Sequence, residues 1–179
     1  MLIKRLDRSN SGEWLDFFDN RAFADHLQWA HCYCTCYFKP VLTGYNKAPY
    51  TNRDYAIWLI ENGIMKGYLA YEDGKAVGWC NANRKDSFPG LARSYDNEEV
   101  QSIVCYVVEK KYRGRGISRQ LLDRVVKDAE EEGMKIIEAY PNKRARSASG
   151  NYHGSYEMYE RSGFKEEELK GVRVMRKYL

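Results

Sequence analysis

Residues 100–118, VQSIVCYVVEKKYRGRGIS, join an apolar run to a glycine-rich basic turn. The run 100–108 is rich in β-branched residues and has the length of a buried strand. After the turn, the segment 116–132 places apolar residues on one face of a helix, at Ile117, Leu121, Leu122, Val125, Val126 and Ala129. Residues 100–132 therefore predict a strand, a tight turn and an amphipathic helix in direct succession.

The turn between this strand and this helix has the chemistry of an anion site. The first backbone N–H groups of a helix have no partner within the helix, and the helix dipole adds partial positive charge there. Gly114 and Gly116 carry no Cβ, so a bulky anion can approach the backbone closely. Arg113 and Arg115 add two formal positive charges. The turn is therefore predicted to bind a pyrophosphate.

The spacing excludes the two commonest glycine-rich phosphate loops. A P-loop requires Gly-Lys-Ser/Thr, and a dinucleotide-binding turn requires three spaced glycines followed by an acidic residue about 20 positions later. The turn instead resembles the Arg/Gln-x-x-Gly-x-Gly/Ala signature of the GCN5-related N-acetyltransferase (GNAT) superfamily. Arg113, Gly116 and Ser118 occupy its three positions, and Ser118 departs from the usual Gly or Ala.

A second motif supports this resemblance. Residues 155–164, SYEMYERSGF, resemble the last helix of the family, which ends in a Tyr-x-x-x-Gly-Phe signature. Tyr159 is the matching tyrosine and lies 46 residues after Arg113. That separation fits one helix, one strand and a loop.

The resemblance implies an α/β GNAT fold. Its mixed parallel and antiparallel central sheet has six or seven strands, is flanked by about four helices, and has splayed fourth and fifth strands. The 179 residues suit one domain by size. Residues 1–66 are expected to be an N-terminal region that shapes the acceptor site, and residues 67–179 an acetyl-CoA-binding core.

Composition restricts the partners. The 29 basic residues face 25 acidic ones, which indicates local anion binding and argues against a nucleic-acid surface. No run approaches the roughly 18 apolar residues that span a membrane, and the N-terminus lacks the apolar core of a signal peptide. We expect a cytoplasmic protein with reduced cysteines and no membrane partner. A homodimer is left open.

The resemblance also assigns cofactor contacts. The unpaired backbone of Tyr106, Val107 and Val108 is expected to bind the pantetheine arm and the thioester carbonyl of acetyl-CoA. The loop contributes Arg113, Gly114, Arg115, Gly116, Ile117 and Ser118. Many members carry an asparagine seven residues before the tyrosine, where this chain has Tyr152. Asn142 and Asn151 are the candidate replacements.

The catalytic assignments are Tyr159 as general acid and Glu98 or Glu99 as the base. A phenol and a thiol both have a pKa near about 9 to 10, so Tyr159 can give its proton to the departing thiolate of CoA. Packing in the core is the alternative role for Tyr159. Glu98 and Glu99 open the predicted fourth strand, where family bases often lie, and solvated strand-end charges are their alternative role.

The run His31-Cys32-Tyr33-Cys34-Thr35-Cys36 suggests a metal site, because alternate residues of a strand share one face. The spacing argues against this reading, since structural zinc sites normally use Cys-x-x-Cys pairs and no second pair is present. The run is instead predicted to be a packed strand or a pocket wall. Cys80 and Cys105, each within an apolar strand, are predicted to lie in the core.

The sequence leaves three candidate functions. The leading one is an acetyl-CoA-dependent N-acetyltransferase that moves an acetyl group directly to a primary amine of a small molecule or peptide, without a metal. The second is a catalytically silent CoA-binding module that acts as a sensor or partner. The third, RNA binding through residues 113–119, lacks the aromatic platform that such proteins use.

Overall fold

The computed structural model describes residues 1–39, 51–91, 99–147 and 149–179. Its strands are β1 (Leu2–Arg5), β2 (Gly67–Glu72), β3 (Lys75–Arg84), β4 (Val100–Val108), β5 (Ile136–Ala139), β6 (Lys165–Leu169) and β7 (Val172–Tyr178). Its α-helices are α1 (Ser11–Asn20), α2 (Asn52–Glu61), α3 (Ile117–Glu131) and α4 (Tyr156–Arg161). The predicted strand, turn and helix around residues 100–132 are confirmed.

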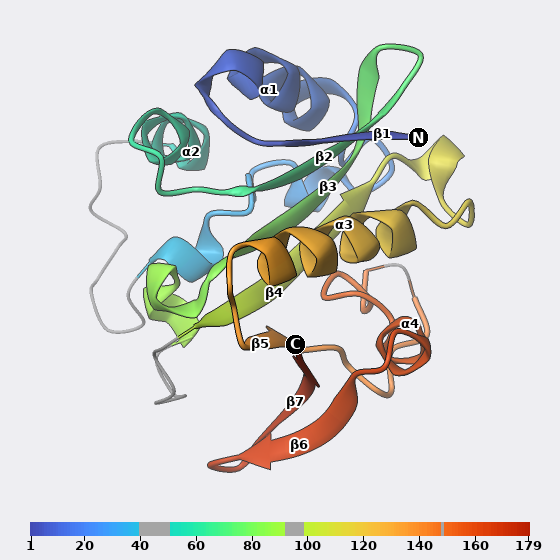
Figure 1. The fold of residues 1–179 in the computed structure, drawn as a ribbon. Coiled ribbons are helices and arrows are strands. Elements are labelled where there is room, and N and C mark those ends of the chain that lie inside the picture. The colour runs from blue at the N-terminus through green and yellow to red at the C-terminus, as the bar shows by residue number, and fades with distance from the viewer. Residues whose placement is uncertain (40–50, 92–98, 148) are drawn as a thin grey trace.

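The seven strands form one sheet in the order β1-β2-β3-β4-β5-β7-β6. β4 and β5 pair in parallel, and the other neighbours pair antiparallel. Figure 1 shows α1 and α2 on one side of the sheet and α3 across the other. The mixed parallel and antiparallel sheet of six or seven strands flanked by about four helices, as expected from the sequence, is therefore confirmed.

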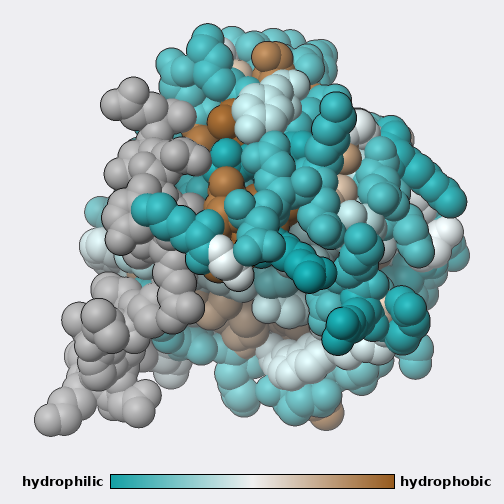
Figure 2. Space-filling view, turned by 90° about the horizontal axis from the view of Figure 1, so that it is seen from below, coloured by the Kyte–Doolittle hydropathy of each residue, from teal (hydrophilic) through white to brown (hydrophobic). Residues whose placement is uncertain are grey.

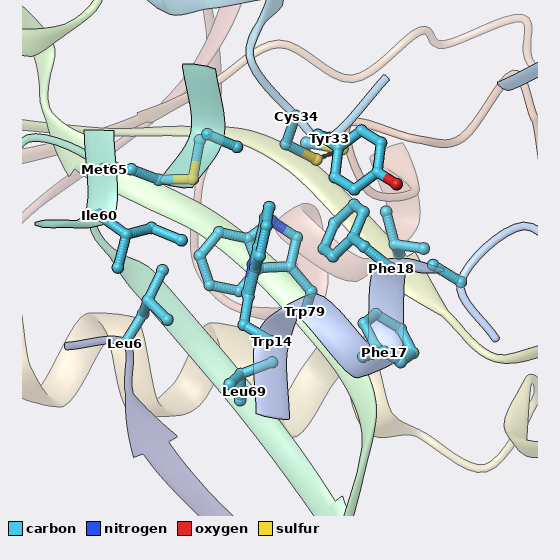
Figure 3. Packing of buried hydrophobic residues seen from close by; sticks show 14 of the residues in the cluster. Leu6, Trp14, Phe17, Phe18, Tyr33, Cys34, Ile60, Met65, Leu69 and Trp79 are labelled. Carbon is cyan, nitrogen blue, oxygen red and sulfur yellow. Dashed lines mark hydrogen bonds between the residues drawn. The ribbon is translucent and has the colours of Figure 1, made fainter. Parts of the chain in front are cut away.

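Aromatic residues fill the core between α1 and the sheet (Figure 3). The ring of Trp14 stacks on Phe18 at 4.2 Å between centroids and meets the edge of Trp79 at 5.8 Å. Position 67 on the neighbouring strand requires glycine, because a Cβ there would lie 2.3 Å from the Trp79 indole. The core thus depends on the fit of one large ring against one glycine.

The opposite face of the sheet packs on α3. Ile117, Leu121 and Val125 are buried against strand residues, as the helical spacing predicts. The end of the molecule that carries β6 and β7 is covered mostly by hydrophilic residues, with small apolar areas between them (Figure 2). Among the described helices, none is long and apolar enough to span a bilayer.

β4 and β5 part after four paired residues. The last pair is Ile103 with Ala139, whereas β4 continues to Val108. On the other side of β4, the β3 partners step from Cys105 to Ile103, which leaves Val104 as an extra residue. Such a bulge bends the strand that contains it. The expected splay of the fourth and fifth strands is confirmed.

The loop before α4 covers the opened edge of β4. The Tyr106 amide donates to the Tyr152 carbonyl at 2.6 Å, and His153 Nδ1 lies 2.7 Å from the Val104 carbonyl. The expectation that the backbone of Tyr106 is unpaired is therefore wrong for its amide. The cause is this loop, which lies against the edge of β4 and supplies the carbonyl that accepts from the Tyr106 amide.

His153 is held as one tautomer. A carbonyl can only accept, so Nδ1 carries the proton and Nε2 accepts from the Tyr37 hydroxyl at 3.1 Å. Burial lowers the pKa of His153 from 6.5 to about 4. The imidazole is therefore neutral near pH 7.

Replacing Trp79 with Ala should lower the free energy of unfolding by about 3–5 kcal/mol, because a fully buried ring leaves a cavity. Denaturant titration measures this. The control is Trp58→Ala, which removes a half-exposed indole from α2 and should cost less than about 1 kcal/mol. Equal losses in the two variants would contradict the packing described for this core.

His153 should make stability depend on pH. Its folded pKa lies below the unfolded value, so its contribution is complete above pH 6.5 and is lost as the pH falls from 6.5 toward about 4. Between pH 7.5 and pH 5 the wild type should lose about 2 kcal/mol more than His153→Gln in denaturant unfolding. The same pH dependence in both proteins would show that His153 is not buried as a neutral group.

Candidate functional site

A cavity of about 650 Å³ lies between the opened end of β4, the start of α3 and the loop before α4. Most of the cofactor residues predicted from the sequence line it together: Tyr106, Val107, Val108, Arg113, Gly114, Gly116, Ile117, Ser118 and Asn151. Arg115 and Asn142 do not. The Arg115 guanidinium lies over the Tyr112 ring at 5.2 Å, and Asn142 Oδ1 accepts from the Arg144 amide at 3.0 Å.

The glycine-rich turn before α3, which is predicted to bind a pyrophosphate, forms one end of the cavity. Gly114 and Gly116 have φ of +75° and +77°, a left-handed conformation that other residues adopt at a cost. Gly116 caps α3 without a side-chain hydrogen bond, so the first amides of a 15-residue helix face the cavity. A Cβ at either glycine would meet no atom within 4 Å, which means that the space over the turn is open.

Arg113 does not supply the free charge that its sequence position predicts. Its guanidinium makes two hydrogen bonds to Asp25, at 2.6 and 2.9 Å, and its Nε donates to the Val108 carbonyl at 2.9 Å. A bidentate pair of this kind satisfies the arginine's charge locally. Arg113 therefore fastens the glycine turn to β4 and to the loop after α1, and the helix amides are left to attract the anion.

Val108 lies at the opened edge of β4, but the expectation that its backbone is unpaired is wrong for its carbonyl, which accepts from Arg113. In a strand, the N–H and C=O of one residue point to the same side. Because the Val108 carbonyl meets Arg113 on the side away from β3, its N–H faces that side as well. Val108 is thus the strand residue best placed to offer an amide to a ligand in the cavity.

Tyr159 lies beneath the cavity wall. It is fully buried, and its hydroxyl donates to the His153 carbonyl at 2.8 Å. Gly154 separates it from the cavity, since a Cβ on Gly154 would lie 3.0 Å from the Tyr159 hydroxyl. Burial raises the pKa of Tyr159, so the phenol keeps its proton. Its role as general acid stays a prediction.

The two candidate bases differ in what can be said of them. Glu98 lies outside the described residues. Glu99 is exposed, has a φ of +63°, and uses its carbonyl to accept from the Lys135 and Ile136 amides. Along an extended strand it lies about 23 Å from Tyr106. It does not line the cavity, and its role as base stays a prediction.

The cysteine run is a turn and not a strand. Tyr33 and Cys34 both have left-handed φ, which breaks the alternation that a strand requires. Cys32 and Cys36 line the cavity, as the pocket-wall interpretation predicts. Cys80 and Cys105 are both buried core residues, as expected, and Cys105 also lines the cavity. The described residues contain no group of three His, Cys, Asp or Glu that could hold a metal.

Several cavity residues have no sequence motif. Phe23, His26 and Trp29 reach it from the loop after α1, so residues 1–66 line the same cavity as the residues predicted to bind the cofactor. Asp25 lies 88 positions from Arg113, and no local pattern connects the two. The Tyr-His-Gly sequence at 152–154 was the one available signal for His153, because it replaces the family's asparagine.

Comparison with known proteins identifies the family of this chain. The model of the acetyltransferase (GNAT) family matches residues 26–164. An uncharacterized N-acetyltransferase of Methanocaldococcus jannaschii is 29% identical over 140 residues, which are 74% of this chain and 55% of the relative. The chain thus spans about half the length of the curated relative that it matches.

Solved structures share the fold at low identity. The ribosomal-protein-alanine N-acetyltransferase of Brucella melitensis superposes with a TM-score of 0.57 at 18% identity, covering 100% of both chains. The GNAT domain of S. lividans PAT gives 0.61 at 14% identity, covering 99% of this chain and 89% of that domain. The family match covers well over half of the sequence and includes both signatures. This chain belongs to the acetyltransferase (GNAT) family.

Proposed function

We propose that the protein is an acetyl-CoA-dependent N-acetyltransferase that moves the acetyl group directly to a primary amine. The observation that carries this proposal is the single cavity of about 650 Å³ that joins the glycine turn to the opened edge of β4. Its volume lies in the range of sites that hold a cofactor-sized ligand. The acceptor is a small molecule or a peptide, and the cytoplasm is the proposed location.

The two ends of the cavity suit the two ends of acetyl-CoA. The amides at the start of α3 and the open space over Gly114 and Gly116 fit a pyrophosphate. At the other end, the Val108 amide is a fixed donor for the arm or for the thioester carbonyl. The Tyr106 amide joins it once the Tyr152 carbonyl has moved away.

Direct transfer requires three proton and charge movements. The amine attacks the thioester carbonyl, and negative charge develops on an oxygen that a β4 amide stabilises, which can contribute about 3 kcal/mol. Tyr159 gives its phenol proton to the departing thiolate once the loop at 152–154 has moved aside, and the amine proton passes by way of water to a carboxylate, for which Glu98 and Glu99 are the sequence candidates. Burial raises the pKa of Tyr159, which weakens its phenol as an acid toward a thiolate in the unopened loop conformation.

A catalytically silent CoA-binding module is the second candidate. The structure has two features that favour it. The Tyr159 hydroxyl is directed at the His153 carbonyl, and the Tyr106 amide is directed at the Tyr152 carbonyl. Both groups that the reaction would use are therefore engaged by the loop at 152–154.

Gly116→Glu should abolish acetyl-CoA binding, because the carboxylate would stand in the open space where a pyrophosphate is expected and repel it. Isothermal titration of wild type and variant measures the loss, with micromolar binding expected for the wild type. Gly74→Glu is the matched control, since Gly74 also has a positive φ and open surroundings but lies in the β2–β3 turn. Equal weakening of acetyl-CoA binding by both substitutions would contradict the assignment of the turn before α3 as the pyrophosphate site.

Tyr159→Phe should lower turnover by about 10²–10⁴-fold with little change in acetyl-CoA affinity. Release of CoA thiol is followed over a panel of primary amines, and affinity is followed by titration. Unchanged turnover would remove Tyr159 from the mechanism. Tight binding without turnover for any amine in the wild type would favour the silent module.

A further inference from the structure

Three thiols line the cavity, and a fourth lies in contact with one of them. Cys32, Cys34 and Cys36 come from the turn after residue 30, and Cys105 comes from β4. The sulfur of Cys34 lies 3.3 Å from the sulfur of Cys105. Figure 3 shows Cys34 and its neighbour Tyr33 at the edge of the aromatic core. The proposed acyl transfer uses none of these groups.

The turn holds these thiols together in an unfavourable backbone conformation. Tyr33 and Cys34 are consecutive non-glycine residues with φ of +44° and +47°. This conformation persists only where the surroundings enforce it. Here the Tyr33 hydroxyl donates to Asp19 at 2.7 Å, and its ring packs on Phe18 at 5.9 Å between centroids.

The thiols differ in access. Cys34 is buried, whereas Cys32 and Cys36 line the cavity. Cys105 also lines the cavity and directly precedes Tyr106, at the end where the sulfur of a bound CoA is expected. The sulfur atoms of a CoA disulfide bound in this way would therefore lie near Cys32 and Cys36 inside the cavity.

The thiols also differ in acidity. The neighbouring thiols of Cys34 and Cys36 and the cation of Lys39 lower the pKa of Cys32. The same contact raises the pKa of Cys36, because a second thiolate beside Cys32 is unfavourable. Cys32 is therefore the first thiolate of the cluster, and Cys36 stays protonated as long as Cys32 is charged.

We propose that Cys32 and Cys36 form a dithiol that reduces disulfides of CoA within this cavity. The inference rests on the proposed binding of CoA there and adds a second reaction to the site. It gives a use to the spacing of the cysteine run, which the acyl transfer leaves unexplained.

The reaction takes place in two exchanges. The Cys32 thiolate attacks one sulfur of CoA disulfide, which forms a Cys32–CoA mixed disulfide and expels CoA thiolate, and that thiolate takes a proton from water. Cys32 is then uncharged, so the largest cause of the raised pKa of Cys36 is removed. Cys36 loses its proton, attacks Cys32 and expels the second CoA thiolate. Two protein thiols are oxidised to a disulfide, and one CoA disulfide is reduced to two thiols.

The test mixes reduced, reductant-free protein with CoA disulfide and follows released CoA thiol together with the intact protein mass. The wild type should release two thiols per chain and carry no adduct. Cys36→Ser should release one and keep CoA bound through Cys32. Cys32→Ser should slow the first release by at least about tenfold. Cys80→Ala, which alters a cysteine of β3 outside the cluster, is the matched control and should behave as the wild type.

A second arm shows where the reaction occurs. CoA disulfide should react at least about tenfold faster than glutathione disulfide, and Gly116→Glu should remove that excess. Wild-type rates in Cys32→Ser, or equal rates for the two disulfides, would overturn the inference. If acetyl-CoA binds by titration and this test fails, the proposed function stands alone. If acetyl-CoA does not bind, both fail.

Discussion

The unpaired residue Val104 in β4 is the constraint on which the rest of the site depends. Because β4 has one residue more than β3 between Ile103 and Cys105, the strand bends, and it parts from β5 after Ile103. Beyond this point, the edge of β4 that faced β5 is contacted by the loop before α4 and by the turn before α3. The cavity lies beside the part of β4 that continues beyond this parting.

Arg113 links this edge to the rest of the molecule. Its contacts with Asp25 and Val108 tie three segments together: the loop after α1, the end of β4 and the glycine turn. A charged residue in a phosphate-binding motif can therefore act by fixing the loop that presents the amides. The attraction for an anion then depends on backbone groups, which cost no rearrangement when the ligand binds.

The sequence predicted the features that depend on local patterns. The apolar spacing after Gly116 identified the face of α3, and the glycines identified the turn before it, which the structure confirms. Long-range pairs left no local signal, which is why Asp25 as the partner of Arg113 was missed. The cysteine run was predicted as a strand or pocket wall because its cysteines alternate with other residues. The left-handed backbone at Tyr33 could not be predicted, because no glycine stands at that position. The Tyr106 amide was misjudged because the loop at 152–154 departs from the family.

The central claim is that acetyl-CoA lies in this cavity, with its pyrophosphate at the start of α3 and its arm along Val108. A crystal structure of the protein with CoA tests it most directly. The account predicts hydrogen bonds from the first α3 amides to the pyrophosphate and from the Val108 amide to the arm. A CoA molecule bound elsewhere, or one whose pyrophosphate rests on the basic residues of the 143–146 loop, would contradict it.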